Sequence, residues 1–550
     1  MATQTANFKG APAPSPSSQS GAPSAPKAQS QISEYRWIIL LGLLTAAIME
    51  VLDTTIINVA LPQMAGNLGA TSQEIAWVST GYILSNVVVL PMTAFLAATF
   101  GRRRYLVAST VIFIVASFLC GTSHSLGELV LWRVIQGAGG AALLSTAQAT
   151  LRQIFPQEQQ ALVQALFLMG IIVAPTLGPT LGGWITDNYT WNWCFFINVP
   201  IGIVSVFLIG TYLQDDPDAV RRTGKIDLLG IGLLAVGLSC LQYVLEEGQQ
   251  DDWFNDPTIV RLSVISAVSL IGMFWWELSP KNKTPVVDFR VMKNRDLSAG
   301  LFLFIALGFG LYGGIYLYPL LAQIVFGFTP TTTGLTLLPG GLGTAASALI
   351  CGRILSAKKP IVDARILIFF GVFIFAYSMW EMGHLTTSAG EGDVRMALLM
   401  RGFGLGFLFA PINNAVYGSI NPKDAQQASG LINLARQLGG SFGIAILGTY
   451  LTNQTHYHRA ELVSRVYNGS VLLQQRTQGL EANLRTHGLS ATDAQHVALA
   501  QIDRSLMRQA TILAYNNAWL LILVTFVCAA PAILLLRKPK SKPGAAVDAH

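Results

Sequence analysis

Apolar residues occur along this chain in long runs, without the apolar–polar alternation that is typical of a half-buried β-strand. Most runs contain about 20 residues, the length at which an α-helix crosses the hydrocarbon core of a bilayer. The pattern predicts an all-α polytopic membrane protein with fourteen transmembrane (TM) helices. The predicted spans are residues 37–59, 76–98, 104–123, 127–149, 162–185, 195–213, 227–245, 258–277, 298–324, 332–355, 364–384, 395–418, 427–452 and 512–536.

The composition is that of a membrane protein. Of 550 residues, 52% are hydrophobic and only 12% are charged, and the mean hydropathy is +0.49. In a soluble domain about a quarter of the residues are charged. The formal net charge of +6 does not by itself indicate nucleic acid, and we expect no nucleic-acid partner.

The sequence also argues against an enzyme. The five cysteines are widely separated and show no Cys-x-x-Cys or Cys/His spacing, so no metal site is predicted. The sequence has no P-loop, the motif that binds the phosphates of ATP, so ATP is not expected to be the energy source. No nucleophile–base constellation is apparent. We therefore expect no enzymatic activity and no cofactor.

Both chain ends are predicted to lie on the same side of the membrane. Residues 1–35 are rich in Ala, Pro, Ser and Gln, which predicts a disordered tail, and residues 537–550 form a second tail. Lys and Arg gather on one set of connections, and the positive-inside rule then places both termini in the cytoplasm. These basic residues are Arg36, Arg102, Arg103, Arg104, Arg221, Arg222, Lys225, Lys281, Lys283, Arg290, Lys293, Arg295, Lys358, Lys359, Arg365, Arg537, Lys538, Lys540 and Lys542.

One connection on the opposite side differs from the others. Residues 453–511 form a long polar segment before the last span, and translocated loops of this length are largely exempt from the charge rule. Within it, Ala491–Ala510 has the apolar spacing of a helix. Two interpretations stay open: a solvated cap, or a docking surface for a partner outside the cytoplasm.

The spans contain an internal echo. The fourth span holds Arg133, followed by Gln136, Gly137 and Gly139, and the twelfth holds Arg401, followed by three spaced glycines. Further pairs at the same separation are Gly182–Gly183 with Gly439–Gly440, and Gly101–Arg102 with Gly352–Arg353. Related positions eight spans apart predict two six-helix bundles, at 36–214 and 298–536, joined by two extra helices within 215–297. Parallel six-helix repeats that share a site at the bilayer midplane are a known plan for carriers.

Charged residues inside the spans are the main candidates for chemistry. Asp53 and Glu50 lie one helical turn apart in the first span, and Arg133 lies in the fourth. A charge at the bilayer centre costs about 2.5–3.5 kcal/mol on insertion scales, so such residues usually pair or line a polar path. Desolvation favours the neutral form of a carboxyl group and a nearby cation favours the charged form, and this balance suits a proton carrier.

Structural roles for these residues stay open. Asp53 could simply bond helix ends and Asn58, and Arg133 could either pair with Asp53 or staple helices through backbone carbonyls. Glu50 is as consistent with a structural role as with proton transfer. Arg436 and Arg401 could be clamps, contacts for anionic substrates or gating residues. The remaining polar candidates for substrate contacts or gating are Asn58, Gln136, Asn413 and Asn414. A minority of the aromatic residues should line the substrate cavity.

Four segments together resemble a known family. Leu52–Pro62 resembles the first-helix signature of the fourteen-helix drug:H⁺ antiporters (EmrB/QacA type) of the major facilitator superfamily (MFS). Arg133–Gly139, Ala174–Gly183 and Trp191–Gly202 resemble this superfamily's fourth-helix motif, its fifth-helix antiporter motif and the start of its sixth helix. The resemblance implies an antiporter that exports hydrophobic or amphipathic compounds by alternating access, with the proton gradient as its energy source.

The same resemblance assigns mechanical roles. Pro175, Gly178, Pro179, Gly182 and Gly183 would form a deformable contact in the fifth span, and the two prolines predict a kink. Gly101, Arg102 and Arg103 would belong to a cytoplasmic gate loop. Three departures are visible. Ala94 and Ala98 replace the usual Gly and Asp of the loop motif, which predicts an altered gate latch, Ala174 replaces a glycine, and Asn192 replaces a frequent arginine.

The long segment before the last span looks most like the EmrB branch. That likeness implies the inner membrane of a bacterium, lipophilic small-molecule substrates, a periplasmic adaptor protein and an outer-membrane channel. Two other hypotheses remain. The chain could export one physiological solute, such as a fatty acid or a siderophore, or it could be a transporter-like sensor or scaffold.

Overall fold

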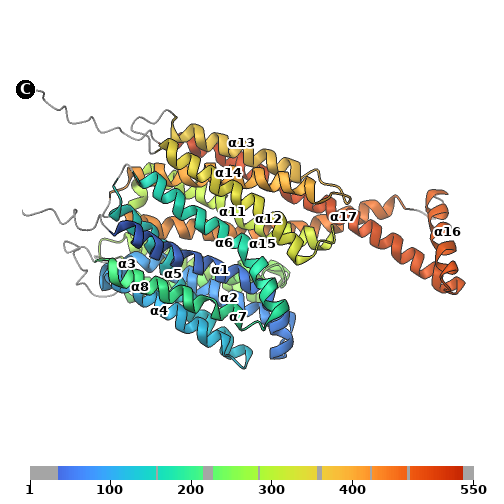
Figure 1. The fold of residues 1–550 in the computed structure, drawn as a ribbon, viewed down its shortest axis with the longest axis horizontal. Helices are drawn as coiled ribbons and strands as arrows, with labels where there is room; N and C mark the ends of the chain where they lie inside the picture. Colours follow the sequence, from blue (N-terminus) through green and yellow to red (C-terminus); the bar gives the residue numbers. More distant parts are fainter. Residues whose placement is uncertain are drawn as a thin grey trace, which may run out of the picture.

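The computed structural model describes residues 35–156, 159–214, 227–282, 285–355, 362–421, 424–466 and 471–536, and within these ranges it is helical, with no β-strand. Both predicted tails, and the basic residues Arg221, Arg222, Lys225, Lys283, Lys358 and Lys359, lie outside the described residues, apart from Tyr35 at the end of the first tail. Figure 1 shows an elongated helical body with an extension at one end.

The helices follow the predicted order. The first group is α1 (Arg36–Leu68), α2 (Ser72–Val89), η2 (Leu90–Met92), α3 (Thr93–Phe100), α4 (Arg102–Gly121), α5 (Leu126–Ile154), α6 (Gln160–Asn188), α7 (Trp193–Phe196) and α8 (Asn198–Tyr212). The linker contains α9 (Leu228–Glu247), η4 (Trp253–Asn255), α10 (Pro257–Leu278) and η5 (Phe289–Lys293). The last group is α11 (Arg295–Ile324), α12 (Pro330–Leu355), α13 (Ala364–Met382), α14 (Glu391–Ser419), α15 (Ala425–Ser464), α16 (Val471–Thr486), α17 (Ala491–Ala529) and η7 (Ala530–Leu535).

Thirteen helices in the described part of the chain are long and apolar enough to cross a membrane. They match every predicted span except 427–452, which lies within α15. That helix packs against α5, α11 and α17 (Figure 1), but Asn433, Arg436 and Gln437 make it too polar to qualify by hydropathy. A helix surrounded by protein can carry such residues because they face the bundle interior and not lipid.

The two halves of the chain use the same glycine contacts. A Cβ atom on Gly137 of α5 would meet the Tyr82 carbonyl oxygen of α2, and one on Gly402 of α14 would meet the Gly340 carbonyl oxygen of α12. In the same way, α6 packs on α1 through Gly178 and Gly182, and α15 packs on α11 through Gly439, Gly440 and Gly443. Small residues let these backbones approach closely. Sequence positions that are repeated eight spans apart therefore also make corresponding packing contacts in the two halves.

The halves meet through crossed pairs of helices. Helix α6 of the first half packs on α12 of the second, and α15 of the second half packs on α5, η2 and α3 of the first. The linker helices α9 and α10 pack against each other, and α9 also packs on α2 and α15. The domain boundaries stay predictions, because packing alone does not define them.

Helices α15 and α17 run far beyond the body (Figure 1). They contain 40 and 39 residues, about 60 Å each at 1.5 Å per residue, roughly twice the hydrocarbon core. With α16 they form an extension, the distal projection (residues 453–466, 471–486 and 491–511). The helix predicted at 491–510 is confirmed as the first half of α17, but the rest of the polar segment is also largely helical and not a loop.

The structure has two distinct ends. Arg36 at the start of α1 and Leu535 at the end of η7 lie at one end, which we call the proximal end, and the distal projection leaves the other (Figure 1). Two termini at one end agree with an even number of spans. Which membrane face the proximal end occupies stays a prediction.

Candidate functional site

Asp53 is enclosed by a polar network in the first half. Its side chain has no exposed surface. Arg133 Nη1 donates to Oδ2 at 2.6 Å, and Oδ1 accepts from Gln136 Nε2 at 3.0 Å and from Asn198 Nδ2 at 2.7 Å. Three helices, α1, α5 and α8, thus converge on one carboxylate. Hydrogen bonds to charged groups are the strong ones, so the network fixes these helices relative to one another.

Arg133 pairs with Asp53 and also staples helices. It is 1% exposed, and its Nε donates to the Val78 carbonyl oxygen of α2 at 2.9 Å while Nη1 also reaches Gln136 Oε1 at 2.9 Å. Its guanidinium lies 4.3 Å from the centroid of the Tyr82 ring, in cation–π contact. The two interpretations of Arg133 are therefore both realised in the structure.

Asn198 is a site residue that the sequence argument does not single out. It begins α8, donates to Asp53, and also contacts Ser117 Oγ on α4 at 3.0 Å. It lies in the Trp191–Gly202 segment, where an asparagine at a helix start looks like a cap. Asn58, in contrast, is exposed and accepts from Ser79, so the alternative in which Asp53 bonds to Asn58 does not describe this structure.

Glu50 has different neighbours from Asp53 although it is one turn away on the same helix. It is 7% exposed, and its Oε1 accepts a long bond of 3.4 Å from Asn86 Nδ2, while the backbone of Leu144 on α5 also lies close to the carboxyl group. Within the described chain its buried Oε2 has no hydrogen-bond partner. The charges on Asp53 and Arg436 both act on it, the first repelling and the second attracting its negative charge. Glu50 is therefore outside the Asp53 network.

Arg436 lies on α15, in the other half. It is 6% exposed, and its Nη2 donates to Asn433 Oδ1 at 3.0 Å, while its buried Nε has no partner among the described residues. Asn433 in turn donates to Gln148 Oε1 of α5 at 3.1 Å, which ties the two halves together. The Arg436 guanidinium lies 6.0 Å from the Phe409 ring centroid.

Arg401 occupies the place in the second half that Arg133 occupies in the first. It is 7% exposed and lies against Gly314 of α11, on which an added Cβ would stand 2.5 Å from Arg401 Nη1. In the described part of the chain that Nη1 has no hydrogen-bond partner, and no ion pair includes Arg401. Asn413 donates to Phe409 O within its own helix, and Asn414 beside it is half-buried.

At the proximal end the halves are joined by polar contacts. Arg152 Nη2 of α5 donates to the Tyr417 carbonyl oxygen of α14, and Ser429 Oγ of α15 donates to the Ser145 carbonyl oxygen at 2.7 Å. Of the predicted gate loop, only Gly101, whose φ of 87° suits glycine, lies between two helices, α3 and α4. Arg102 and Arg103 belong to the first turn of α4, and Arg102 is half-buried. Arg103, however, donates to Gly210 O of its own half. An arginine bond that does cross between the halves here comes from Arg152, which the sequence argument does not single out.

The fifth-span motif packs beside the Asp53 network. Gly178 lies against Thr55, and a Cβ on Gly182 would stand 2.6 Å from the Ile56 carbonyl oxygen, both on α1 just after Asp53. Gly183 has only a distant neighbour, Val59 Cγ1 at 4.0 Å from an added Cβ. Helix α6 continues through Pro175 and Pro179 without a break in its assignment. The motif joins α6 to the segment of α1 that carries the carboxylates.

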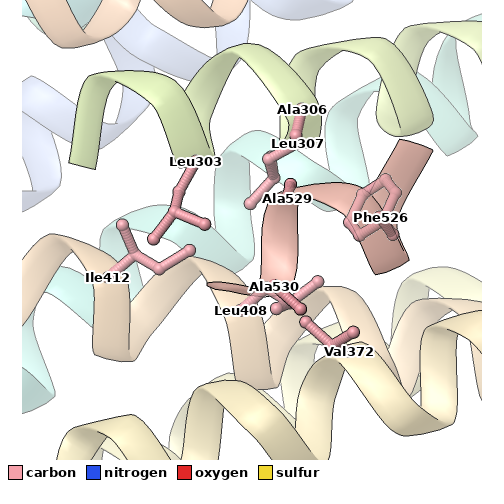
Figure 2. A pocket seen from close by; sticks show the side chains of 9 residues that line it. All are labelled: Leu303, Ala306, Leu307, Val372, Leu408, Ile412, Phe526, Ala529 and Ala530. Atoms are coloured by element: carbon pink, nitrogen blue, oxygen red, sulfur yellow. The ribbon is translucent and has the colours of Figure 1, made fainter. Parts of the chain in front are cut away.

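One cavity in the second half is unsuited to a substrate (Figure 2). It is lined by Leu303, Ala306, Leu307, Val372, Leu408, Ile412, Phe526, Ala529 and Ala530, and its volume is about 10 Å³. That is no more than one water molecule needs. No group of His, Cys, Asp and Glu suited to a metal ion occurs among the residues with described positions.

Comparison with known proteins shows which class of membrane protein has this helical bundle with its buried charge network. Residues 43–444 match the model of the Major Facilitator Superfamily, so the chain belongs to that superfamily of membrane transporters. The crystal structure of the human organic anion transporter MFSD10 (TETRAN) superposes with a TM-score of 0.54 at 13% identity, covering 91% of this chain and all of that one. That likeness confirms the fold.

Within the superfamily the chain belongs to the EmrB type. It is 36% identical to the Multidrug export protein EmrB of Haemophilus influenzae, over 84% of this chain and 89% of the relative. The Escherichia coli K12 protein of the same name is 34% identical, over 93% and 98%. The Fatty acid resistance protein FarB of Neisseria gonorrhoeae is 32% identical, over 92% and 96%. The family resemblance stated from the motifs is confirmed.

Proposed function

We propose that this protein is a proton-driven multidrug exporter of a bacterial inner membrane that exchanges protons for hydrophobic or amphipathic compounds. The observation that carries the proposal is the Asp53 network, in which one buried carboxylate of α1 accepts hydrogen bonds from groups of two other helices, α5 and α8. The names of the EmrB relatives support the substrate class.

The network gives proton binding a structural consequence. A proton on Asp53 removes the negative charge that Arg133 faces, and with it the strongest bond between α1 and α5. Arg133 keeps its bonds to the Val78 carbonyl oxygen of α2 and to Gln136 of its own helix, so its side chain stays in place while α1 is released. Because α6 packs on α1 through Gly178 and Gly182, the release of α1 also frees α6.

That release reaches the interface between the halves. Helix α6 packs on α12 of the second half, and Gly334 of α12 lies against Thr180 of α6. Protonation of Asp53 would thus loosen the contact between α6 and α12. The Arg152–Tyr417 contact at the proximal end would open or close as the halves move. Alternating exposure of a site between the halves follows from such rocking.

The distal projection suits a partner protein. It extends past the length that a bilayer requires, and its exposed side chains include Tyr457, Val471 and Leu499. We propose that a periplasmic adaptor binds there and continues to an outer-membrane channel, with both termini of this chain in the cytoplasm. Co-purification with a candidate adaptor, and its loss on shortening the projection, would test this part.

Proton flux in proteoliposomes tests the central proposal. Lipophilic compounds added to wild type should drive proton movement, and Asp53→Asn should abolish it. Asp187→Asn, which changes an exposed carboxylate at the end of α6, is the matched control and should behave as wild type. Equal flux in wild type and Asp53→Asn would remove Asp53 from the mechanism. No flux with any compound would favour a transporter-like sensor or scaffold.

A second candidate function is the export of a single solute such as a fatty acid. The likeness to FarB favours it, since that protein is named for fatty acid resistance. A resistance panel in a host lacking its own exporters separates the two. Protection against many unrelated compounds supports multidrug export, and protection against fatty acids alone supports the narrow alternative.

A further inference from the structure

The interior of the protein holds one acidic and one basic side chain, from different halves, that form no ion pair with each other in the described structure. Glu50 belongs to the first half and Arg436 to the second, and both are more than nine-tenths buried. The positive charge of Arg436 acts on the Glu50 carboxylate, yet no described ion pair joins them. Each also keeps one buried atom without a hydrogen-bond partner in the described structure, Oε2 of Glu50 and Nε of Arg436.

We propose that Glu50 and Arg436 form the headgroup subsite for substrate, and that it selects amphoteric compounds, which carry a cationic or hydrogen-bond-donating group and an anionic or accepting group on one apolar body. The donor of the headgroup meets Glu50 Oε2 and its acceptor meets Arg436. This inference rests on the proposed export function and names the substrate class of that exporter.

Glu50 is held so that one oxygen stays available. Asn86 Nδ2 contacts Glu50 Oε1 and also donates to the Gly137 carbonyl oxygen of α5 at 3.3 Å. That second bond anchors the amide, so Oε1 is directed toward α2 and α5 while Oε2 is left without a bond. A buried acceptor left unpaired costs free energy, and a ligand donor that reaches it removes that cost.

Arg436 is held in a corresponding way. Asn433 accepts from its Nη2 and itself donates to Gln148 Oε1 of the first half. One side of the guanidinium is thereby fixed by protein, and the Nε edge is left without a partner. An arginine that presents a free N–H edge is suited to a carboxylate or another planar acceptor.

Aromatic side chains complete the subsite. The Phe409 ring lies against the Arg436 guanidinium. Tyr82 is 2% exposed and lies close enough to Glu50 to interact with its charge. Its hydroxyl has no hydrogen-bond partner among the described residues. Aromatic walls bind the apolar body of a ligand, and a few polar groups fix its orientation. The proximity of the opposite charges explains the selectivity, because a ligand with one charge satisfies one residue and leaves the other unpaired.

The alternative is that Glu50 and Arg436 only attract each other to hold the halves together. In that case their removal would change how readily the halves separate but would not change which headgroup binds. Binding selectivity therefore distinguishes the two roles, and it can be measured without a proton gradient. It is thus independent of whether proton-driven export occurs.

The experiment uses three compounds with the same fluorescent body. Naphthylalanine carries both charges, its methyl ester carries only the ammonium, and its N-acetyl derivative carries only the carboxylate. Their affinities for the full chain in lipid nanodiscs are measured by equilibrium dialysis. Wild type should bind naphthylalanine about 10-fold or more tightly than either derivative, a difference of about 1.4 kcal/mol.

The variants locate that selectivity. Glu50→Gln should reduce naphthylalanine affinity to that of the N-acetyl compound, and Arg436→Gln should reduce it to that of the methyl ester. Arg436→Lys keeps the charge and should retain part of the preference, which covers the case in which Arg436→Gln fails to fold. Arg395→Gln and Glu391→Gln, at an exposed ion pair, are the matched controls.

Three outcomes would overturn the inference: equal affinities of the three compounds in wild type, losses in the variants that are uniform across all three, or an unchanged preference in both variants. Amphoteric selectivity without proton flux would keep the subsite and refute the proposed antiport. Proton-driven export of cations and amphoteric compounds alike would support the proposed antiport and refute the amphoteric subsite.

Discussion

The two halves of this protein share a frame and differ in their chemistry. In the first half Arg133 of α5 binds Asp53 of α1 at 2.6 Å, and in the second half Arg401 of α14 faces Gly314 of α11. The glycine contacts that position these helices correspond between the halves, so the arginine is presented in a comparable place each time. The carboxylate is present in only one half. The two halves therefore share a scaffold, and they differ in whether a carboxylate is paired with the arginine.

This difference also divides the interior charge. Glu50 and Asp53 outnumber Arg133 in the first half, whereas Arg401 and Arg436 are the buried charges near the middle of the second. The only other buried charge described in the helices of that half, Asp296, lies in the first turn of α11, eighteen residues before Gly314, too far along the helix to reach Arg401. The buried charged residues described near the middle of the first half are therefore mainly acidic, and those near the middle of the second half are basic.

The strongest way to break the comparison is to remove each arginine. Arg133→Gln should lower the free energy of unfolding by about 3–5 kcal/mol, because Asp53 would stay buried without its cation. Arg401→Gln should leave it unchanged or raise it by about 1–3 kcal/mol, the cost of an unpaired buried polar group. Thermal unfolding in detergent, followed by tryptophan fluorescence, measures both. Similar losses in the two variants would show that Arg401 has a partner equivalent to Asp53.

A second test compares two adjacent glycines of α6. Gly182→Ala places a Cβ 2.6 Å from a backbone oxygen of α1, and overpacking of this kind costs about 1–3 kcal/mol. Gly183→Ala meets only Val59 at 4.0 Å and should be neutral. The same unfolding assay and the drug-induced proton flux should both separate them. If Gly183→Ala is as damaging as Gly182→Ala, close contact with α1 is not what the motif provides.

A third test installs the missing carboxylate. Gly314→Asp should pair with Arg401, since the atom that its Cβ would meet is the end of a flexible side chain. A double-mutant cycle with Arg401→Gln should give a favourable coupling of about 0.5–3 kcal/mol, the range for residues in contact. Unfolding midpoints of the four proteins supply the cycle. A coupling of zero would mean that the introduced carboxylate and Arg401 do not meet, and the structural correspondence would fail.

The smallest expected effect concerns an exposed ion pair. Arg459 and Asp503 join α15 and α17 at 3.1 Å in the distal projection, and both side chains are about half exposed. Such pairs contribute about 0.2–1 kcal/mol and weaken with salt. Arg459→Gln should therefore barely change the unfolding midpoint in high salt. A loss comparable to that of Arg133→Gln would show that the projection is held by this pair rather than by helix packing.

How much the sequence predicts depends on how local the signal is. Asp53, Glu50 and Arg133 stand out because a charge within an apolar run is costly wherever its partner lies. The partner itself is not a local property, so neither Asn198 nor the bond of Arg152 to Tyr417 can be predicted in this way. Helix α15 is predicted as a span from its length, although its polar face hides it from hydropathy. Within the polar segment 453–511 only 491–510 is predicted as a helix, because the other solvated helices lack the apolar stripe that marks a buried one.

Helix α15 is one continuous helix that runs from the interior of the bundle, where Arg436 is buried, to the distal projection. Arg436 and the end of the helix at Ser464 are 28 residues apart along it, about 42 Å at 1.5 Å per residue. A tilt of about 10° around Arg436 would move the far end by about 7 Å on this geometry. A small rotation of the helix at the proposed headgroup subsite thus becomes a larger displacement in the distal projection. If a partner binds the projection as proposed, such a tilt would couple its binding to the occupancy of the proposed subsite.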